Sequence, residues 1–547
     1  MLHSSFEEIS PSNPPAHDTP AMNKRVGYIP LARPLRRKIQ NGMVALTMAI
    51  WCFVRPWSHL LFDGNSYFNK LPAARVELLA LAVNVACFAL MVWLGIGIWR
   101  RCRTGMLSLL LEMSFLFLLV LPADFIRVEL LNMTDSELIG LMRQPAVVPG
   151  LLVILAFLIW KHRLAARALA LIMVITFPVA LLIMAKTILL CLNVTQGKAC
   201  AQSPAPPPLL SMRAGQPRVV WMIFDETDYR LVFEKRPANM LFPELDRLRQ
   251  TALSADHAYP PGDSTIISMP ALISGRRISA ADPDGCDLGL TLADTGATVE
   301  WSALTSVFSR VRELGVNTAL VGWYHPYARL LGASLNYCSW YPFPIFEPAR
   351  STTFGGAMEQ QIASLAGPFH VRQVFINTCK NSLADAAAAA ANPDYGLILL
   401  HLPPPHGPGV YLPENNEFTW RGIAAPAGYF NNLVLADHEL GALRRGMETS
   451  GQWDKSWVIL SADHSWRSSR LYDGVRDYRV PFLVKPPDGG QSLTYCNPFN
   501  TILTQDLILA ILRGEVTNQS TTAAWLDTHG KPDLPVSGSL RNRLGSQ

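Results

Sequence analysis

Long apolar segments fill much of the first 192 residues and constrain the fold more than any other feature. A bilayer hydrocarbon core ~30 Å thick is crossed by about 20 residues of apolar helix. The segment at 43–62 contains Arg55 and Pro56, and the segment at 147–160 is the shortest. The pattern predicts an α-helical membrane bundle of about five spans, near 43–62, 76–99, 106–126, 147–160 and 166–192.

Basic residues are unevenly distributed among the loops between these segments. Cytoplasmic loops of membrane proteins carry an excess of Lys and Arg. Such residues precede the first segment, follow the second and separate the last two, as in Arg100, Arg101 and Arg103, and Lys161, Arg163 and Arg167. The distribution predicts that everything after residue 192 lies outside the cytoplasm.

The composition fits a membrane protein that also carries a large soluble part. Of the 547 residues, 50% are hydrophobic and only 16% are charged, and a soluble chain of this length would carry more charge. The absence of a basic surface interleaved with aromatic residues argues against nucleic acid as a partner. We expect a cytoplasmic tail at 1–40, a transmembrane domain at 41–192, a Pro-rich linker at 193–217 and one α/β domain at 218–547.

The soluble part alternates between short apolar runs and helix-like segments. Stretch 429–451 has leucines at helical spacing and a glycine near its end, as expected for a helix. The runs typical of buried strands are 218–224, 318–323, 395–402, 456–462 and 480–485. Alternation of strands with helices predicts a mostly parallel sheet covered on both faces.

Four of these predicted strands lead into residues that bind metals or transfer protons. Ligands of α/β sheets bind at the carboxyl ends of the strands. An Asp-His pair after one strand is more often a turn, but four strands with this feature favour a functional site. The residues are Asp225 and Glu226, His325, His401 and His406, and Asp463 and His464.

A turn-like stretch, YPPGDS, runs directly into an apolar segment that begins at Thr265. A hydroxyl at this position either caps the helix or acts as a nucleophile. Taken alone, the cap is the more common role of Ser264 or Thr265. Together with the strand-end residues, the pattern favours Thr265 as nucleophile, with Ser264 as the alternative.

The ordered motifs FDET, TIISMP, WYHP, HLPPPHGP and SADH resemble those of the alkaline phosphatase/sulfatase superfamily. Within it, the chain is similar to membrane-anchored phosphoethanolamine transferases and lipoteichoic acid synthases. These enzymes place five spans before an extracytoplasmic sulfatase-like catalytic domain. The sulfatase motif Cys-x-Pro-Ser-Arg is absent, so a formylglycine nucleophile cannot form, and Ser465 replaces the glycine that usually follows the Asp-His pair.

The resemblance implies a role for each motif residue. His401, His406 and His325 would serve catalysis, with His406 and His325 facing the substrate. One divalent metal ion is implied, with Zn²⁺ as the expected ion and Mn²⁺ or Ca²⁺ as alternatives. Metal coordination would activate the Thr265 hydroxyl for attack on a phosphodiester. The implied metal ligands are Asp225, Glu226, Thr265, Asp463 and His464.

The resemblance also implies a function and a location. We expect a transferase of the bacterial inner membrane, with a periplasmic catalytic domain. It would move a phosphoethanolamine or phosphoglycerol head group from a phospholipid donor to an extracytoplasmic glycan or lipid, through a phospho-threonine. The alternatives are a membrane-anchored hydrolase of phosphate or sulfate esters and a degenerate pseudoenzyme. Cys286 and Cys338 flank one insert-like region and are candidates for a disulfide bridge.

Overall fold

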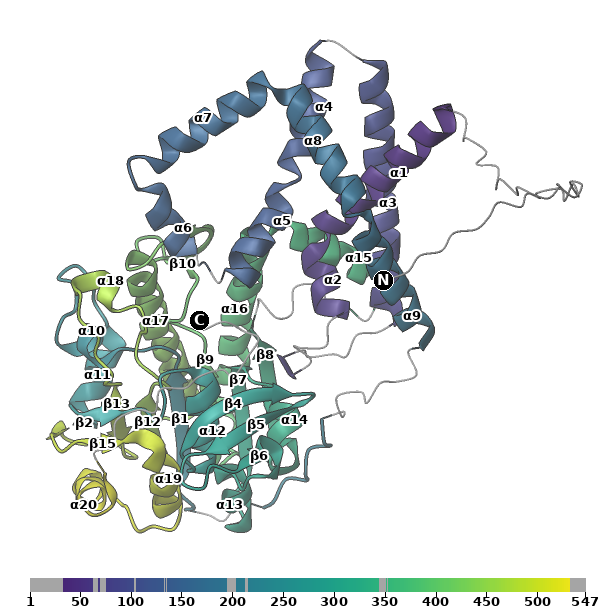
Figure 1. Ribbon diagram of the computed structural model, residues 1–547. Coiled ribbons are helices and arrows are strands. Elements are labelled where there is room, and N and C mark those ends of the chain that lie inside the picture. The colour runs from purple at the N-terminus through teal and green to yellow at the C-terminus, as the bar shows by residue number, and fades with distance from the viewer. Residues whose placement is uncertain are drawn as a thin grey trace, which may run out of the picture.

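A computed structural model of the chain has a helical N-terminal part and an α/β C-terminal part (Figure 1). The predicted tail lies outside the described residues up to residue 32, and its last residues belong to helix α1 (Arg33–Cys52). Residues 203–211 of the predicted linker form no helix or strand. The structure describes residues 33–61, 67–68, 75–102, 105–131, 133, 135–193, 203–211, 215–343, 351 and 353–531.

Among the described residues, two helices are long and apolar enough to cross a membrane. They are α3 (Arg75–Arg101) and the continuous helical stretch Met106–Val128, which begins with α4 (Met106–Phe117). Both coincide with predicted spans. Many of their large apolar side chains are exposed, as expected for helices that face lipid. The chain therefore has helices suited to membrane association.

The other predicted spans are bent or broken. Helix α1 meets α2 (Val54–Leu61) at 71°, and α7 (Val147–Trp160) meets α8 (His162–Ile175) at 91°. If each bent pair is one span, the described helices supply up to four spans. The sequence predicts a basic loop after α7, but most of these residues lie in helix α8, so the prediction of a loop here is wrong.

The fifth predicted span, 166–192, is not one helix. It is divided at Thr176 between α8 and α9 (Phe177–Asn193). Pro178 lies in the first turn of α9. A proline ring disfavours helical backbone in the residue before it and cannot donate a backbone hydrogen bond, which explains why the apolar segment breaks here.

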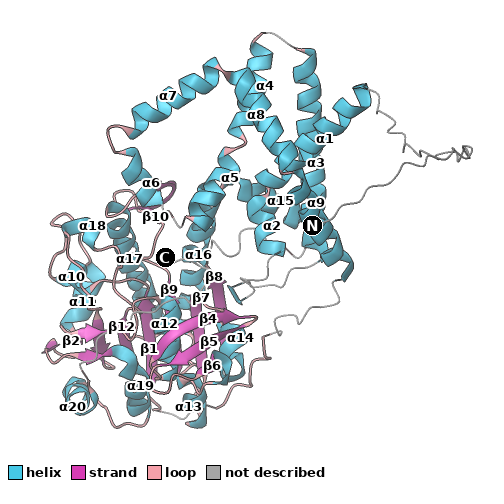
Figure 2. Cartoon of the chain, viewed as in Figure 1, coloured by secondary structure: helices cyan, strands magenta, loops and turns pink. Residues whose placement is uncertain are grey.

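The C-terminal part is built on an eight-stranded sheet (Figure 2). Four consecutive pairings, from β12 to β8, are parallel, and β13 runs antiparallel to β12. All five predicted strands are present, so the mostly parallel sheet is confirmed. The strand order is β14 (Leu493–Tyr495), β2 (Leu253–Ala255), β13 (Phe482–Lys485), β12 (Ser456–Ser461), β1 (Arg218–Phe224), β9 (Leu397–Leu402), β7 (Thr318–Tyr324) and β8 (Tyr337–Pro342).

Helices cover both faces of this sheet (Figure 2). Helix α17 (Ala427–Thr449), which the leucine spacing predicted, packs against α16 (Pro368–Ala391), and α16 contacts β7, β8 and β9. Helices α12 (Thr265–Ser274) and α19 (Thr504–Leu512) pack against each other, and α19 contacts β1. Strands β1, β7, β9 and β12 are fully buried, which explains why their sequences are continuous apolar runs.

The two parts of the chain are in direct contact. Helix α15 (Phe354–Ala363) belongs to the C-terminal part but packs against α3. Asn84 of α3 donates a hydrogen bond to Gln361 Oε1 at 3.0 Å, and Gln361 Nε2 donates to the Glu77 carbonyl at 3.0 Å. All three residues are buried, so this contact fixes α15 against a membrane helix.

The predicted bridge between Cys286 and Cys338 is wrong. Cys286 is disulfide-bonded, whereas Cys338 is not part of a disulfide. Position in the same insert-like region did not determine the pairing, because disulfide connectivity depends on the distance between the cysteines in the folded chain.

Candidate active site

Three adjacent strands bring a group of metal-ligand residues together at the carboxyl edge of the sheet. Asp463 follows β12, Asp225 follows β1, and His401 lies near the end of β9. One ligand atom from each residue lies within 4.8 Å of the others. All three side chains are completely buried. The strand order β12-β1-β9 therefore explains how residues distant in sequence form one cluster.

The facing atoms of this cluster lack hydrogen-bond partners within the described part of the chain. They are Asp225 Oδ1, Asp463 Oδ2 and His401 Nε2. Buried polar atoms are nearly always paired, and leaving one unpaired costs about 1–3 kcal/mol. Two carboxylate oxygens and an imidazole nitrogen suit Zn²⁺ or Mn²⁺. The residues present therefore fit a divalent metal ion, which confirms that this chain has a candidate metal site.

Thr265 lies beside this cluster. Its hydroxyl donates to Asp225 Oδ2 at 3.3 Å and lies 3.3 Å from His464 Nε2. Thr265 begins helix α12, as the sequence predicts, and Ser264 occupies the N-cap position without a side-chain cap hydrogen bond. The arrangement places the Thr265 hydroxyl, rather than that of Ser264, against the candidate metal ligands.

In its neutral form, His464 presents a lone pair to Thr265. Its Nδ1 lies 3.1 Å from the Ser465 carbonyl oxygen, which can only accept, so Nδ1 carries the hydrogen. In a neutral ring Nε2 is then an acceptor. Nε2 also lies 3.7 Å from Asp225 Oδ1 and 3.5 Å from Asp463 Oδ2. It can serve as a metal ligand or accept the Thr265 proton.

The two buried aspartates have pKa values shifted in opposite directions. Burial, and then the charge of Asp463, raise the pKa of Asp225 to about 8. Burial also acts to raise the pKa of Asp463, but the charges of His464 and His401 outweigh it and lower this pKa. Like-charged carboxylates in one apolar site cannot both ionise cheaply. A bound cation would remove this conflict.

Glu226 lies beside the cluster, with its carboxylate bonded to Arg467. Its Oε1 accepts from Arg467 Nε at 3.1 Å, while its backbone N–H donates to Asp463 Oδ1 at 3.2 Å. Burial acts to raise the pKa of Glu226, but the charges of His406 and Arg467 lower it to about 2. The structure thus groups His401, rather than Glu226, with the two aspartates, and metal ligation by Glu226 stays a prediction.

His325 and His406 differ in how much of each side chain is exposed to solvent. His325 is fully buried, and burial lowers its pKa to about 3. His406 is half-buried, and its ring lies 5.1 Å from that of Trp323. His406 is therefore the more accessible of the two, and a substrate-facing role stays a prediction for both.

Three residues at the site carry backbone strain or a charge that the sequence interpretation missed. Glu226 has φ 64° and Tyr324 has φ 73°, conformations that cost non-glycine residues of order 1 kcal/mol or more and cluster at functional sites. Arg467 is half-buried beside Glu226, whose charge raises the pKa of Arg467 against the effect of burial. The sequence feature that could have identified Arg467 is its position three residues after the Asp-His pair.

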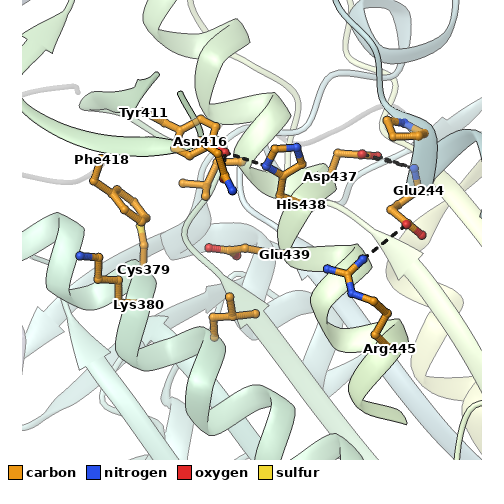
Figure 3. Close-up of a pocket in the computed structure, with 14 residues that line it drawn as sticks. Glu244, Cys379, Lys380, Tyr411, Asn416, Phe418, Asp437, His438, Glu439 and Arg445 are labelled. Atoms are coloured by element: carbon orange, nitrogen blue, oxygen red, sulfur yellow. Dashed lines mark hydrogen bonds and ion pairs between the residues drawn. The ribbon is translucent and has the colours of Figure 1, made fainter. Parts of the chain in front are cut away.

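A separate cavity of about 530 Å³ lies between α16, α17 and β10 (Gly409–Leu412), and none of its lining residues is a candidate site residue. Figure 3 shows Glu439 among the residues that line this cavity. Glu439 is 2% exposed, and its Oε2 lacks a hydrogen-bond partner within the described residues. Burial raises its pKa well above the usual value.

Replacing Glu439 by glutamine is expected to stabilise the folded protein increasingly as the pH rises. A raised carboxyl pKa gives stability that is complete below the unfolded pKa of about 4.3 and is lost as the pH rises through the folded pKa. Glutamine does not titrate, so the Tm of E439Q should exceed that of the wild type by roughly 2 °C or more at pH 8. The exposed Glu414→Gln is the control, and a Tm difference that does not grow between pH 5 and 8 would contradict this account.

Comparison with known proteins agrees with the fold of the C-terminal part. Residues 217–513 match the Sulfatase family model. No curated protein matches the chain. The fold and the site define a member of the alkaline phosphatase/sulfatase superfamily. The chain belongs to the sulfatase family. Membership of this family indicates that the protein is an enzyme that acts on phosphate or sulfate esters.

Several solved structures are similar to this chain at low identity and low TM-score. Ps i-CgsB in complex with a neocarrahexaose is 14% identical, with a TM-score of 0.42 over 60% of this chain and 80% of that one. The phosphonate monoester hydrolase of Agrobacterium radiobacter is 11% identical, with 0.37 over 55% and 74%. Murine ectonucleotide pyrophosphatase/phosphodiesterase 5 is 10% identical, with 0.36 over 55% and 95%. These values are too low to indicate a substrate.

Proposed function

We propose that this protein is a membrane-anchored, metal-dependent transferase. It moves a phospholipid head group, of the phosphoethanolamine or phosphoglycerol type, to a glycan or lipid outside the cytoplasm. The observation that carries the proposal is the position of the Thr265 hydroxyl, 3.3 Å from both Asp225 and His464. A hydroxyl held between two proton acceptors, beside ligand atoms that lack partners, is placed to act as a nucleophile.

The residues of the site divide the chemistry among them. Asp225, Asp463, His401 and His464 would hold the metal ion, which supplies positive charge that favours the alkoxide form of Thr265. The Thr265 oxygen forms a bond to phosphorus as the bond from phosphorus to the lipid alcohol breaks. The threonine proton passes to the Asp225 carboxylate, because the Nε2 lone pair of His464 would be used to hold the ion, and the departing alcohol takes a proton from His406.

The second half of the reaction restores the enzyme. The hydroxyl of the acceptor attacks phospho-Thr265 and its proton passes to His406, while the threonine oxygen leaves phosphorus and takes back the proton that Asp225 accepted in the first half. The contact between α15 and α3 supports a lipid donor, because it fixes the catalytic part beside a helix suited to the bilayer, where head groups lie. Sulfatase-family membership favours the second candidate, a hydrolase of phosphate or sulfate esters in which water is the acceptor.

Head-group-labelled phosphatidylethanolamine and phosphatidylglycerol distinguish the two candidates. Full-length protein in vesicles of these lipids, mixed with an envelope lipid and glycan extract, should move the label to an acceptor. Thr265→Ala protein should leave the label on the donor. Label released only into water would replace the transferase with the hydrolase. Release that persists in the Thr265→Ala protein would overturn the proposed site.

We also propose that the catalytic part faces the periplasm of a bacterial inner membrane. Cys496 is an exposed thiol of the C-terminal part, and Cys102 lies in a basic stretch assigned to the cytoplasm. A membrane-impermeant maleimide should label Cys496 in intact spheroplasts and Cys102 only after lysis, as read by peptide mass spectrometry. The reverse pattern would place the catalytic part in the cytoplasm.

A further inference from the structure

A segment from the membrane part of the chain enters the core of the catalytic part. Tyr67 and Phe68 lie between α2 and α3, yet both are fully buried in the catalytic core. The Phe68 ring lies 5.4 Å from that of Tyr324, edge to face. Arg329 Nη1 donates to the Tyr67 carbonyl oxygen at 3.1 Å. The segment is therefore fixed on both its side-chain and its backbone atoms.

Tyr67 is connected to the nucleophile through one histidine. The Tyr67 hydroxyl lies 2.9 Å from His325 Nδ1, and His325 Nε2 lies 3.1 Å from the carbonyl oxygen of Thr265. His325 is completely buried, and its ring packs edge-to-face against Trp301 at 4.9 Å. Packing and hydrogen bonds thus leave the imidazole one orientation.

The hydrogen-bond directions in this chain follow from the chemistry of its ends. The Thr265 carbonyl oxygen can only accept, so His325 Nε2 carries the hydrogen. Burial disfavours a charged ring, so a neutral His325 has its lone pair on Nδ1. The Tyr67 hydroxyl must then donate to Nδ1. Tyr67 therefore selects the tautomer of His325 that can bind the backbone of Thr265.

We propose that Tyr67 is a positioning residue for the nucleophile, which makes the catalytic site incomplete without the membrane part of the chain. The proposal rests on the proposed role of Thr265. Through His325, Tyr67 holds the carbonyl of Thr265 and thereby the first turn of α12. A displaced nucleophile reacts slowly even when its neighbours are intact, and a 1 Å error can cost about 10²-fold in rate.

A double-mutant cycle tests this connection. Tyr67→Phe keeps the buried ring but removes the donor, and should lower kcat about tenfold with KM within about twofold. Glutamine at 325 can donate to the Thr265 carbonyl without a tautomer to select. In the His325→Gln background, Tyr67→Phe should therefore lower kcat little further, because the two residues act as one unit.

The cycle uses a simple substrate and a matched control. The full chain, loaded with metal, is assayed with bis(4-nitrophenyl) phosphate, which needs no lipid recognition. Tyr411→Phe removes another tyrosine–histidine hydrogen bond, between the Tyr411 hydroxyl and His438 Nδ1 at 2.6 Å, and also the donation from this hydroxyl to Asn416 Oδ1, both outside the site (Figure 3). It should leave kcat unchanged. An unchanged kcat in Tyr67→Phe, independent losses in the double variant, or an equal loss in Tyr411→Phe would overturn the proposal.

A second measurement is independent of turnover. Nitrogen-15 spectra of histidine-labelled protein, with the His325 signals assigned by their loss in His325→Gln, report which ring nitrogen carries the hydrogen. Hydrogen on Nε2 in the wild type and a changed tautomer population in Tyr67→Phe are expected. An unchanged tautomer would overturn the role of Tyr67. If Thr265→Ala stays active, the proposed function fails, and these spectra still decide what Tyr67 does.

Discussion

Thr265→Ala is expected to lower kcat by at least about a thousandfold, in line with the loss of a nucleophile in other covalent mechanisms. Alanine removes the oxygen that lies 3.3 Å from Asp225 and His464 but leaves these acceptors and the candidate metal ligands in place. Metal content should therefore persist while turnover stops. Initial rates with labelled phospholipid and with bis(4-nitrophenyl) phosphate, together with the metal content of the same samples, check this prediction.

Ser264→Ala is the matched control for this variant. Ser264 precedes Thr265 and makes no side-chain cap hydrogen bond to α12, so its hydroxyl does little for the helix. We expect activity within about threefold of the wild type and little change in Tm, since surface-like changes of this kind stay within ~0.5 kcal/mol. Loss of activity in Ser264→Ala with activity retained in Thr265→Ala would reassign the nucleophile to Ser264.

Asp225→Asn is expected to abolish metal binding and activity while it stabilises the metal-free protein. Asp225 faces Asp463 in a fully buried cluster, and an unpaired buried charge is costly. Asparagine keeps the shape of the side chain but removes its charge. The metal ion therefore loses a ligand, and the metal-free protein loses the repulsion between Asp225 and Asp463. Metal content and Tm, measured with and without chelator, give the two opposite effects.

The pKa of Asp225 determines how the stability difference between metal-free Asp225→Asn and the metal-free wild type changes with pH. The pKa of Asp225 is raised to about 8, first by burial and then by the charge of Asp463. Its stabilising contribution is complete below the unfolded pKa of about 3.9 and is lost as the pH rises through about 8. The Tm advantage of metal-free Asp225→Asn should therefore grow between pH 5 and 8.

Metal has the opposite effect on the wild type. Binding to the folded state alone stabilises it by about 2.7 kcal/mol when the free ion is at a hundred times its Kd, and Asp225→Asn should lose this response. Asp437→Asn is the control, because Asp437 is another buried aspartate, bonded to the backbone N–H of Leu245 at 2.8 Å. An Asp225→Asn protein that still binds the ion at wild-type affinity would contradict the assigned site.

The sequence predicted the parts of the fold that short-range pattern determines. Continuous apolar runs identified β1, β7, β9, β12 and β13, because fully buried parallel strands carry no polar face. The residues after these strands also predicted that Asp225 and Asp463 would meet, since parallel strands end at one edge of the sheet. Their distance from each other depended on the order β12-β1-β9, which no local pattern contains.

The remaining features depend on long-range packing. His401 joins the two aspartates in the candidate metal cluster, and Arg467 Nε donates to the Glu226 carboxylate at 3.1 Å, a contact between residues 241 positions apart in sequence. Tyr67 reaches His325 from 258 residues away in sequence, and nothing in its neighbours predicts this. The apolar pattern of residues 166–192 likewise did not predict the position at which α8 and α9 separate.

The most direct test of the central claim is a chemical trap of the covalent enzyme. Full-length protein is incubated with phosphatidylethanolamine or phosphatidylglycerol, quenched in acid and digested, and the peptide that contains Thr265 is weighed. The account predicts the mass of a phosphoryl head group on Thr265 in the wild type and its absence in Asp463→Asn. Turnover without any modification of Thr265, or with the added mass on a different residue, would contradict it.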